Sequence, residues 1–166
     1  MLPDRDDDSP ELRQNLARLL EGIEEDLRQR PTLETARRWQ IEIMQNLRAP
    51  DPKYVGAFRG EAGLENVQVR VDALWGVAAP EVAEALRDFE QHLQGAVAYL
   101  DDWVPPGAEL DDDRLTAILS VCAWAHAEWV RIHPFANGNG RTAVGQQPRD
   151  ALRSAAIRAS APETCR

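Results

Sequence analysis

Apolar residues recur three and four positions apart in four stretches of this 166-residue chain, and this spacing constrains its fold more than any other feature. The stretches cover residues 10–29, the segment between Pro31 and Pro50, residues 80–100 and residues 112–132. A helix with this pattern buries one face against its neighbours. We therefore expect a mainly α-helical fold. A length of 166 residues with 43% hydrophobic content is enough for a single domain with one core.

Each expected helix has boundary signals and an apolar stripe. Ser9 and Pro10 suit an N-cap and a first helical position, and the aspartates from Asp111 to Asp113 suit the start of the last helix. The expected stripes are Leu12, Leu16, Leu19, Leu20, Ile23 and Leu27, then Leu33, Ala36, Ile43 and Leu47, then Val82, Leu86, Phe89, Leu93, Val97 and Leu100, and finally Leu115, Leu119, Cys122, Trp129 and Ile132.

The segment from residue 53 to residue 78 breaks the helical pattern. Glycines punctuate it, and valines alternate with polar residues from Val67 to Val71, which is typical of a short, half-buried strand. We therefore expect one β-hairpin before the last two helices.

The charge balance excludes one class of partner. The formal net charge is −9 and Lys53 is the only lysine, so no basic patch for a nucleic-acid backbone is expected. The remaining cations are arginines, a bias that GC-rich codons produce, and this points to a bacterial source. No apolar run has the length of a membrane span, no secretion signal is apparent, and Cys122 and Cys165 show no metal or disulfide spacing. We expect a cytoplasmic protein with reduced thiols and no membrane partner.

One loop combines residues that structural loops rarely need together. It joins one of the three histidines to a Gly-rich turn and a fixed cation, in the run His133-Pro134-Phe135-Ala136-Asn137-Gly138-Asn139-Gly140-Arg141. Backbone N–H groups of such a turn can converge on an anion, and an arginine adds a permanent planar charge. A neighbouring histidine can accept a proton near neutral pH. The loop therefore predicts phosphoryl or nucleotidyl transfer.

This run resembles the signature of the Fic family, His-x-Phe-x-(Asp/Glu)-Gly-Asn-Gly-Arg-x-x-Arg, and matches it through Arg141 with one substitution. Residues 56–59 and 67–71 are similar to the family's hairpin flap, and residues 125–132 are similar to the helix that leads into its catalytic loop. The resemblance implies a helical Fic-like domain with one β-hairpin flap before the catalytic core helices.

The resemblance also divides the chain. Residues 1–30 would form an N-terminal helix, residues 31–143 the Fic-like domain, and residues 144–166 an atypical tail. The family has an apolar helix after the motif, whereas Pro148 interrupts the helical pattern here. A reading frame that shifts after codon 143 would explain this loss of pattern, and translation of the other frames would test it.

The activity that the resemblance implies is protein adenylyltransfer, in which AMP passes from ATP to a hydroxyl side chain of a target protein. His133 would be the general base, and Asn137 would help to place Mg²⁺ on the nucleotide. The resemblance assigns nucleotide and phosphate binding to Asn137, Gly138, Asn139, Gly140 and Arg141. The target protein would dock on the hairpin of residues 56–76.

Two departures from the signature leave a second class open. Asn137 brings no charge where the family has a carboxylate, and Val144 stands where the second arginine would contact the outer phosphate. The alternative is a catalytically degenerate or truncated Fic-like module that binds a nucleotide or a protein, with an antitoxin-like regulator as a further candidate partner. Within enzymes, the superfamily also transfers phosphate or phosphocholine, and the loop alone does not choose the donor. Self-inhibition through Glu21-Gly22 is a further hypothesis, although Ala17 replaces the Ser or Thr of the family's inhibitory motif.

Overall fold

The computed structural model describes residues 9–26, 30, 32–71, 73–105, 107–139 and 142, with the side chains of 23–26 and 71 left aside. Its helices are α1 (Pro10–Asp26), α2 (Leu33–Ile43), α3 (Val82–Trp103) and α4 (Asp112–Ile132), with short 3-10 turns η1 (Pro52–Tyr54) and η2 (Ala79–Glu81). Strands β1 (Arg70–Val71) and β2 (Leu74–Trp75) pair antiparallel. The predicted architecture, mainly helical with one hairpin before the last two helices, is confirmed.

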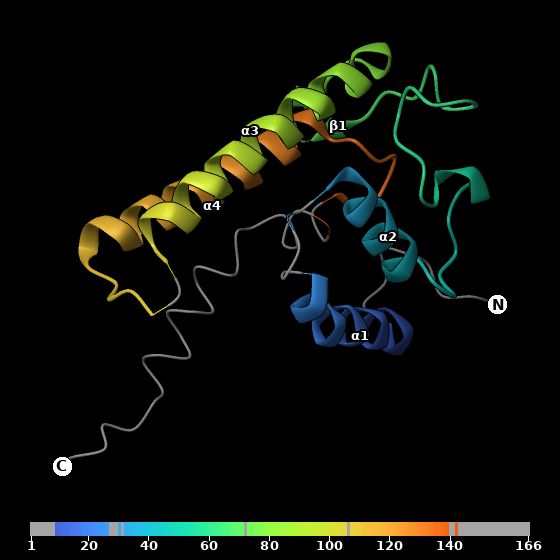
Figure 1. Ribbon diagram of the computed structural model, residues 1–166. Helices are drawn as coiled ribbons and strands as arrows, with labels where there is room; N and C mark the ends of the chain where they lie inside the picture. The colour runs from blue at the N-terminus through green and yellow to red at the C-terminus, as the bar shows by residue number, and fades with distance from the viewer. Residues whose placement is uncertain are drawn as a thin grey trace.

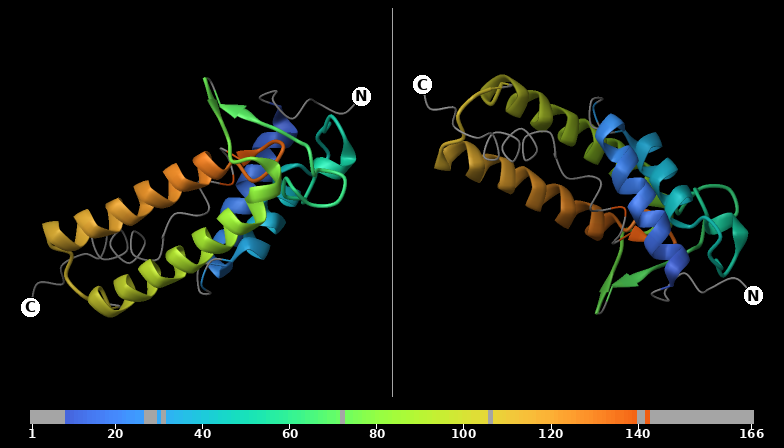
Figure 2. Two further views of the ribbon diagram at one scale, coloured as in Figure 1. Left: turned by 90° about the horizontal axis from the view of Figure 1, so that it is seen from above. Right: turned by 90° about the horizontal axis from the view of Figure 1, so that it is seen from below.

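The two longest helices form the body of the molecule. α3 and α4 lie side by side and antiparallel along their length, and α1 and α2 pack together at one end of this pair (Figure 1). The hairpin projects from the same end, where α3 begins and α4 ends (Figure 2). The loop that follows α4 therefore lies where the hairpin and α2 converge.

Side-chain caps fix three of the helix starts. Ser9 Oγ accepts a hydrogen bond from Leu12 N at 3.1 Å, and Asp111 Oδ1 accepts one from Arg114 N at 2.8 Å. Thr32 caps α2 in the same way. α2 ends at Ile43, well before Pro50, because the chain turns at Asn46 with a left-handed φ of 59°.

Two main clusters of apolar side chains form the core. One joins α3, α4 and the two loops that flank the site, with Phe89, Trp129 and Phe135 at most 2% exposed. The other joins α1 to α2 around Trp39 and Ile43. Because the first cluster includes residues from the hairpin segment and from the loop after α4, the core itself holds the site in place.

Three leucines that we expected on the buried stripes are exposed, so their assignment to those stripes is wrong. Leu20 of α1 and Leu119 of α4 are each 50% exposed, because each lies one position, or about 100° around the helix, beyond the buried Leu19 and Ile118. In α4 the buried stripe runs through Ile118, Cys122, Ala125, Trp129 and Ile132, and Leu115 in the first turn is 38% exposed. Of the α1 stripe, the Ile23 side chain and Leu27 lie outside the described residues.

The expected strand over Val67–Val71 is shorter than predicted. Only its last two residues pair with β2, and Gly76 N adds one hydrogen bond to Val69 O at 3.1 Å. Val67 is not paired with β2, because its N–H donates to Leu64 O in a turn and its carbonyl accepts from the Arg59 guanidinium. The start of the segment thus binds a side chain and not a neighbouring strand.

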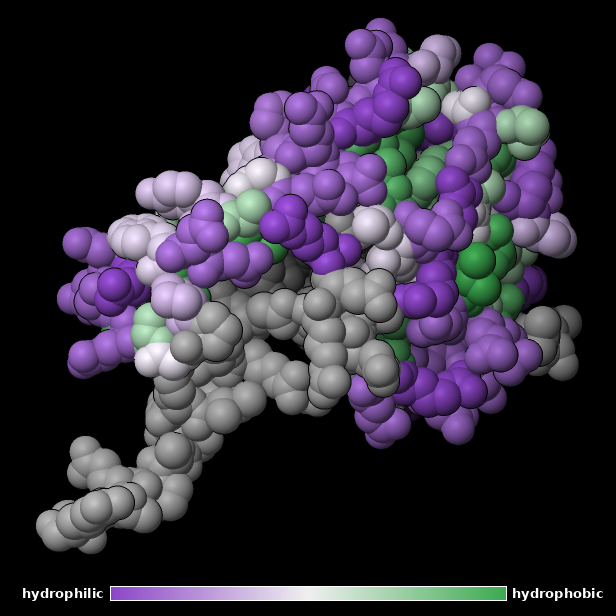
Figure 3. Space-filling model, viewed as in Figure 1, coloured by the Kyte–Doolittle hydropathy of each residue, from purple (hydrophilic) through white to green (hydrophobic). Residues whose placement is uncertain are grey.

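Hydrophilic residues cover most of the face seen in Figure 3, and apolar residues show mainly in recesses between them. Within the described ranges, no helix has the length and apolar character needed to cross a membrane.

Candidate active-site loop

α4 delivers His133 to the loop at its own C-terminus. His133 is the C-cap residue, with a left-handed backbone (φ 51°, ψ 60°), and its N–H donates to Trp129 O at 2.9 Å. The left-handed conformation turns the chain out of the helix directly at the histidine. A Cβ added at Gly76 would lie 3.0 Å from His133 Cβ, so the end of the hairpin lies against the histidine.

The surroundings of His133 favour a neutral imidazole. Burial lowers the pKa of this half-buried side chain, a hydrogen bond to Val130 O raises it, and the positive charge of Arg59 lowers it further, with a net decrease. Nδ1 lies 3.3 Å from Val130 O, which can only accept, so Nδ1 carries the proton. The free lone pair of the neutral ring is then on Nε2, which is the atom that could accept a proton from a hydroxyl group.

Phe135 anchors the loop in the core. Its ring is fully buried and lies 4.8 Å, between ring centroids, from that of Phe58 in the hairpin segment. The two backbones form an isolated antiparallel bridge, and Arg59 N donates to Pro134 O at 2.7 Å. The loop and the hairpin segment are thus held together by both packing and hydrogen bonds.

Asn139 closes the loop on itself. Its Oδ1 accepts from Phe135 N at 2.8 Å and its Nδ2 donates to Phe135 O at 2.7 Å, so the side chain copies a backbone pair. Gly138 next to it has a φ of +78°, which a glycine adopts without strain. The side chain of Asn139 therefore has a structural role, and its backbone N–H is the group that would remain for the expected phosphate contact.

Thr142 ties the far side of the loop to α4. Its N–H donates to Gly138 O at 3.2 Å, the bond that a helical turn makes, and its Oγ1 accepts from Trp129 Nε1 at 3.2 Å. The first N–H groups of a helix have no partner within it and point towards an anion. Of the predicted phosphate-binding residues, Gly140 and Arg141 lie outside the described residues.

A buried arginine connects the hairpin segment to the catalytic histidine candidate. Arg59 is 1% exposed, and its guanidinium donates to His133 O at 2.7 Å, Ile132 O at 2.8 Å, Val77 O at 2.7 Å and Val67 O at 3.2 Å. Two of these carbonyls are at the C-terminus of α4, where the helix dipole favours a cation. Burial lowers the pKa of Arg59. The side chain fixes the backbone on which His133 is carried.

An ion pair between Arg37 of α2 and Glu61 holds the hairpin segment against α2. Arg37 forms a two-bond pair with Glu61 at 2.6 and 2.9 Å, and its guanidinium carbon lies 4.3 Å from the centre of the Phe58 ring. The bond to Arg37 holds the pKa of the Glu61 carboxyl below its usual value. Glu61 also accepts from Phe58 N at 3.1 Å, so the pair supports the residue that packs on Phe135.

Asn137 is held from α2 by Gln40. Gln40 Nε2 donates to Asn137 Oδ1 at 3.0 Å, and Gln40 is fully buried. The amide oxygen of Asn137, the atom that would bind Mg²⁺, is thus engaged by a donor, and the atom left over is the Nδ2 donor. No group of three or more His, Cys, Asp or Glu side chains suited to a metal ion is found in the described part of the chain. The residues at this position do not fit Mg²⁺.

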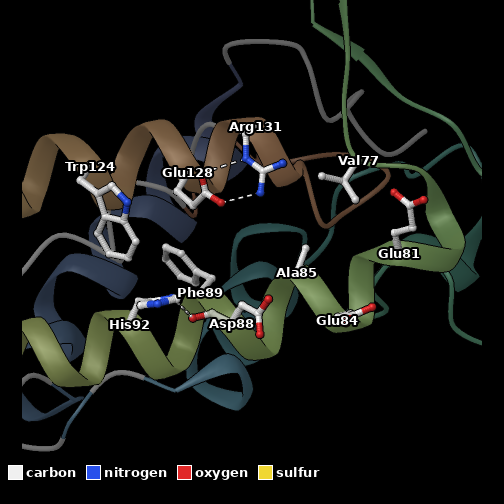
Figure 4. A pocket seen from close by; sticks show the side chains of 10 residues that line it. All are labelled: Val77, Glu81, Glu84, Ala85, Asp88, Phe89, His92, Trp124, Glu128 and Arg131. Carbon is white, nitrogen blue, oxygen red and sulfur yellow. Dashed lines mark hydrogen bonds and ion pairs between the residues drawn. The ribbon is translucent and has the colours of Figure 1, made fainter.

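A groove of about 470 Å³ lies on the other side of the α4 terminus, between α3 and α4 (Figure 4). Its floor contains Phe89 and the partly exposed Trp124. Four carboxylates line it, Glu81, Glu84, Asp88 and Glu128, and Glu128 pairs with the groove's arginine, Arg131. This concentration of negative charge would repel phosphate, so the groove is poorly suited to an anionic nucleotide.

Sequence reasoning missed the residues that position the loop. Gln40 was not singled out, although a polar residue four positions after Ala36 and three before Ile43 falls on the buried stripe of α2. Arg59 was noted only as part of a resembling segment, and Thr142 was not considered. A polar side chain on an apolar stripe was the available signal for Gln40, whereas nothing in the pattern indicated the partners of Arg59.

Comparison with known proteins supports the resemblance. The model of the Fic/DOC family matches residues 30–144, which is more than half of the chain. A search of curated proteins gives no match. The matched segment contains α2, the hairpin, α3, α4 and the loop with His133 at its start. The chain therefore belongs to the Fic/DOC family.

Proposed function

We propose that this protein is an adenylyltransferase that transfers AMP from ATP to a hydroxyl side chain of a target protein. The observation that carries the proposal is the state of His133, a half-buried imidazole with a lowered pKa, its Nδ1 proton directed to Val130 O and its Nε2 lone pair available. Membership of the Fic/DOC family supports a transferase of this general type.

The proposed reaction follows from these groups. Nε2 of His133 takes the proton of the target hydroxyl, whose oxygen attacks the α-phosphorus of ATP. The bond between the α-phosphorus and the bridging oxygen breaks, and pyrophosphate leaves. Charge that develops on the phosphate oxygens is stabilised by Arg141 and by N–H groups around Gly138, Asn139 and Gly140, each donor contributing about 3 kcal/mol.

The hairpin is the proposed docking site of the target. Leu74 and Trp75 are 75% and 67% exposed, which is unusual for large apolar side chains. They belong to β2, and the neighbouring residue Gly76 lies against His133. An extended segment of a target could add to this short ladder and bring its hydroxyl group towards the imidazole.

The test is transfer of label from α-³²P-ATP to protein in a bacterial lysate, with His133→Ala beside the wild type. Loss of a general base lowers the rate by about 10² to 10⁴, so His133→Ala should show no detectable label. His126→Ala is the matched control, because this exposed histidine is on the same helix, and it should label like the wild type. Label that persists in His133→Ala would overturn the assignment of the base.

A second candidate function is nucleotide or protein binding without catalysis. The observation that favours it is Asn137, whose amide brings no charge and whose Oδ1 already accepts a hydrogen bond from Gln40 Nε2. In that case no variant would transfer label, including Asn137→Asp, yet the protein would still bind the nucleotide. A panel of nucleotide donors would then separate an inactive module from an enzyme with another donor.

A further inference from the structure

We propose that Asn137 binds its ligand as a hydrogen-bond donor, through Nδ2 to a phosphate oxygen, and that nucleotide binding in this loop is independent of Mg²⁺. The inference rests on the proposed nucleotide function for the identity of the ligand. It does not rest on transfer, because it concerns binding alone.

The orientation of Asn137 is fixed by a backbone group. Gly56 N can only donate, and it lies 2.6 Å from the Gln40 atom Oε1, which must therefore be the oxygen. The other terminal atom of Gln40 is then Nε2, which lies 3.0 Å from one terminal atom of Asn137 and 3.4 Å from Tyr54 O. Because Nε2 is a donor, the Asn137 atom that faces it is Oδ1. These hydrogen bonds therefore identify Nδ2 as the terminal atom of Asn137 that does not face Gln40.

Nδ2 of Asn137 is buried and has no hydrogen-bond acceptor among the residues that the structure describes. The residue is 7% exposed, and no described residue accepts a hydrogen bond from this atom. A buried donor without a partner is destabilising, and few are found in native proteins. Asn137 is followed directly by Gly138, whose left-handed φ of +78° turns the chain into the Gly-rich segment. A ligand oxygen in the loop would satisfy the donor.

The chemistry of a donor is opposite to that of the carboxylate in the family signature. An N–H group attracts a phosphate oxygen and repels a cation, whereas a carboxylate repels phosphate unless a cation lies between them. The Asn137 site therefore selects an anionic or carbonyl-like oxygen directly. Asn137→Asp changes the donor into an acceptor with almost no change in shape. Oδ1 of the aspartate can keep the hydrogen bond from Gln40 Nε2, while its second oxygen replaces the Nδ2 donor.

The experiment measures binding of α,β-methylene-ATP, whose α–β bridge cannot be cleaved in adenylyl transfer, by isothermal titration calorimetry. Each protein is titrated in excess EDTA and again in MgCl₂. For the wild type we expect Kd values that agree within about threefold in the two buffers. For Asn137→Asp we expect binding at least tenfold weaker than wild type in EDTA, recovered when Mg²⁺ is added. Asn137→Ala should weaken binding about tenfold in both buffers.

Gln40→Glu provides a second, independent variant. Its carboxylate would keep the bond from Gly56 N and accept from Asn137, which turns the Asn137 amide and presents Oδ1 to the ligand. Binding in EDTA should then fall as it does in Asn137→Asp. Thermal unfolding of each variant is recorded first, and if Gln40→Glu does not fold, the two Asn137 variants decide.

The outcomes separate this inference from the proposed function. Wild-type binding that needs Mg²⁺, or Asn137→Asp binding that equals wild type in EDTA, overturns the donor role and leaves adenylyl transfer standing. Binding that is independent of Mg²⁺ in a protein that transfers no label supports the donor role and overturns only catalysis. If the analogue binds to none of the proteins in either buffer, both proposals are wrong.

Discussion

Single side chains that bind backbone carbonyls determine where His133 lies. Arg59 is the clearest case, because its one guanidinium donates to two carbonyls at the end of α4 and to two in the hairpin segment. A lysine could not reach all four, since its ammonium group is compact and has no planar fork. The position of the candidate base therefore depends on a residue that does not react.

Arg59→Met should remove these hydrogen bonds while it keeps most of the side-chain volume. Carbonyls left buried without a donor destabilise the fold, and we expect a loss of about 3 kcal/mol or more in the free energy of unfolding, measured by urea denaturation. Arg131→Met is the control, because this arginine forms an exposed pair with Glu128 and its removal should change stability by less than about 1 kcal/mol. Similar losses for both variants would contradict the role given to Arg59.

The lowered pKa of His133 predicts the pH dependence of transfer. Burial disfavours the imidazolium, and the Arg59 charge adds to this effect. The base therefore stays neutral to lower pH than an ordinary histidine, whose pKa is about 6.5. We expect the transfer rate to fall to half its value at pH 8 only below about pH 6.5. A rate that already falls by half above pH 7 would show that the pKa is raised.

At the scale of elements, the hairpin segment and the start of α3 approach each other too closely for a side chain. Gly60 has a φ of +90°, and a Cβ added to it would lie 2.2 Å from Ala79 O of η2. This contact places the hairpin segment against the turn that begins α3, and so fixes the hairpin relative to the body of the molecule.

Gly60→Ala should be strongly destabilising. The backbone of η2 must move and the left-handed φ is strained for alanine, so we expect a loss of about 2–3 kcal/mol in unfolding free energy. Gly95→Ala is the matched control, since Gly95 lies within α3 and the added Cβ would have no atom of another element within 4 Å, and it should raise stability by about 0.5–1 kcal/mol. Thermal unfolding of the two variants would decide, and an equal melting temperature for both would refute the contact.

At the scale of the whole molecule, the ion pair between Arg37 and Glu61 links α2 to the hairpin segment and contributes to acid sensitivity. The pKa of Glu61 is lowered in the folded state, chiefly by its bond to Arg37. Its stabilisation is therefore present above the unfolded-state pKa, about 4.5, and is lost as pH falls through the folded value. His133 acts in the same direction, because its lowered pKa makes folding less favourable below about pH 6.5.

We expect the melting temperature to fall as pH decreases from 7 to 4. His133→Ala should flatten the part of this curve that begins below about pH 6.5, and Glu61→Gln the part that begins below about pH 4.5. A Glu61→Gln curve parallel to the wild type throughout would show that the pair contributes no pH-dependent stability.

The helices were predictable because their information is local. Asp111 caps α4 and the bounds Asp112–Ile132 follow from that cap and the apolar spacing, as predicted. The face of a helix is fixed less well by spacing alone, since Leu119 and Ile118 are both apolar neighbours and only packing decides which is buried. The same ambiguity gave the wrong assignment for Leu20.

The motif indicated a candidate loop but not the residues that hold this loop in place. The run that begins at His133 includes Asn137, Gly138 and Asn139, and it directly follows α4. The partners of these residues come from distant parts of the chain, as Gln40 does for Asn137. Periodicity predicts which face of a helix a residue occupies, and a motif indicates its chemical role. Neither predicts which carbonyl or amide from a distant part of the chain forms a hydrogen bond with it.

Because Gln40 and Asn137 are both amides, their pairing also gives nucleotide binding and nucleotidyl transfer different pH dependences. Neither amide gains or loses a proton between acid and mildly alkaline pH, and among the described loop residues 133–139 His133 is the only side chain that does. Nucleotide affinity and the rate of nucleotidyl transfer should consequently depend on pH through different titrating groups. A pH titration of binding would report the ligand's own phosphates, while a pH titration of turnover would report a single imidazole.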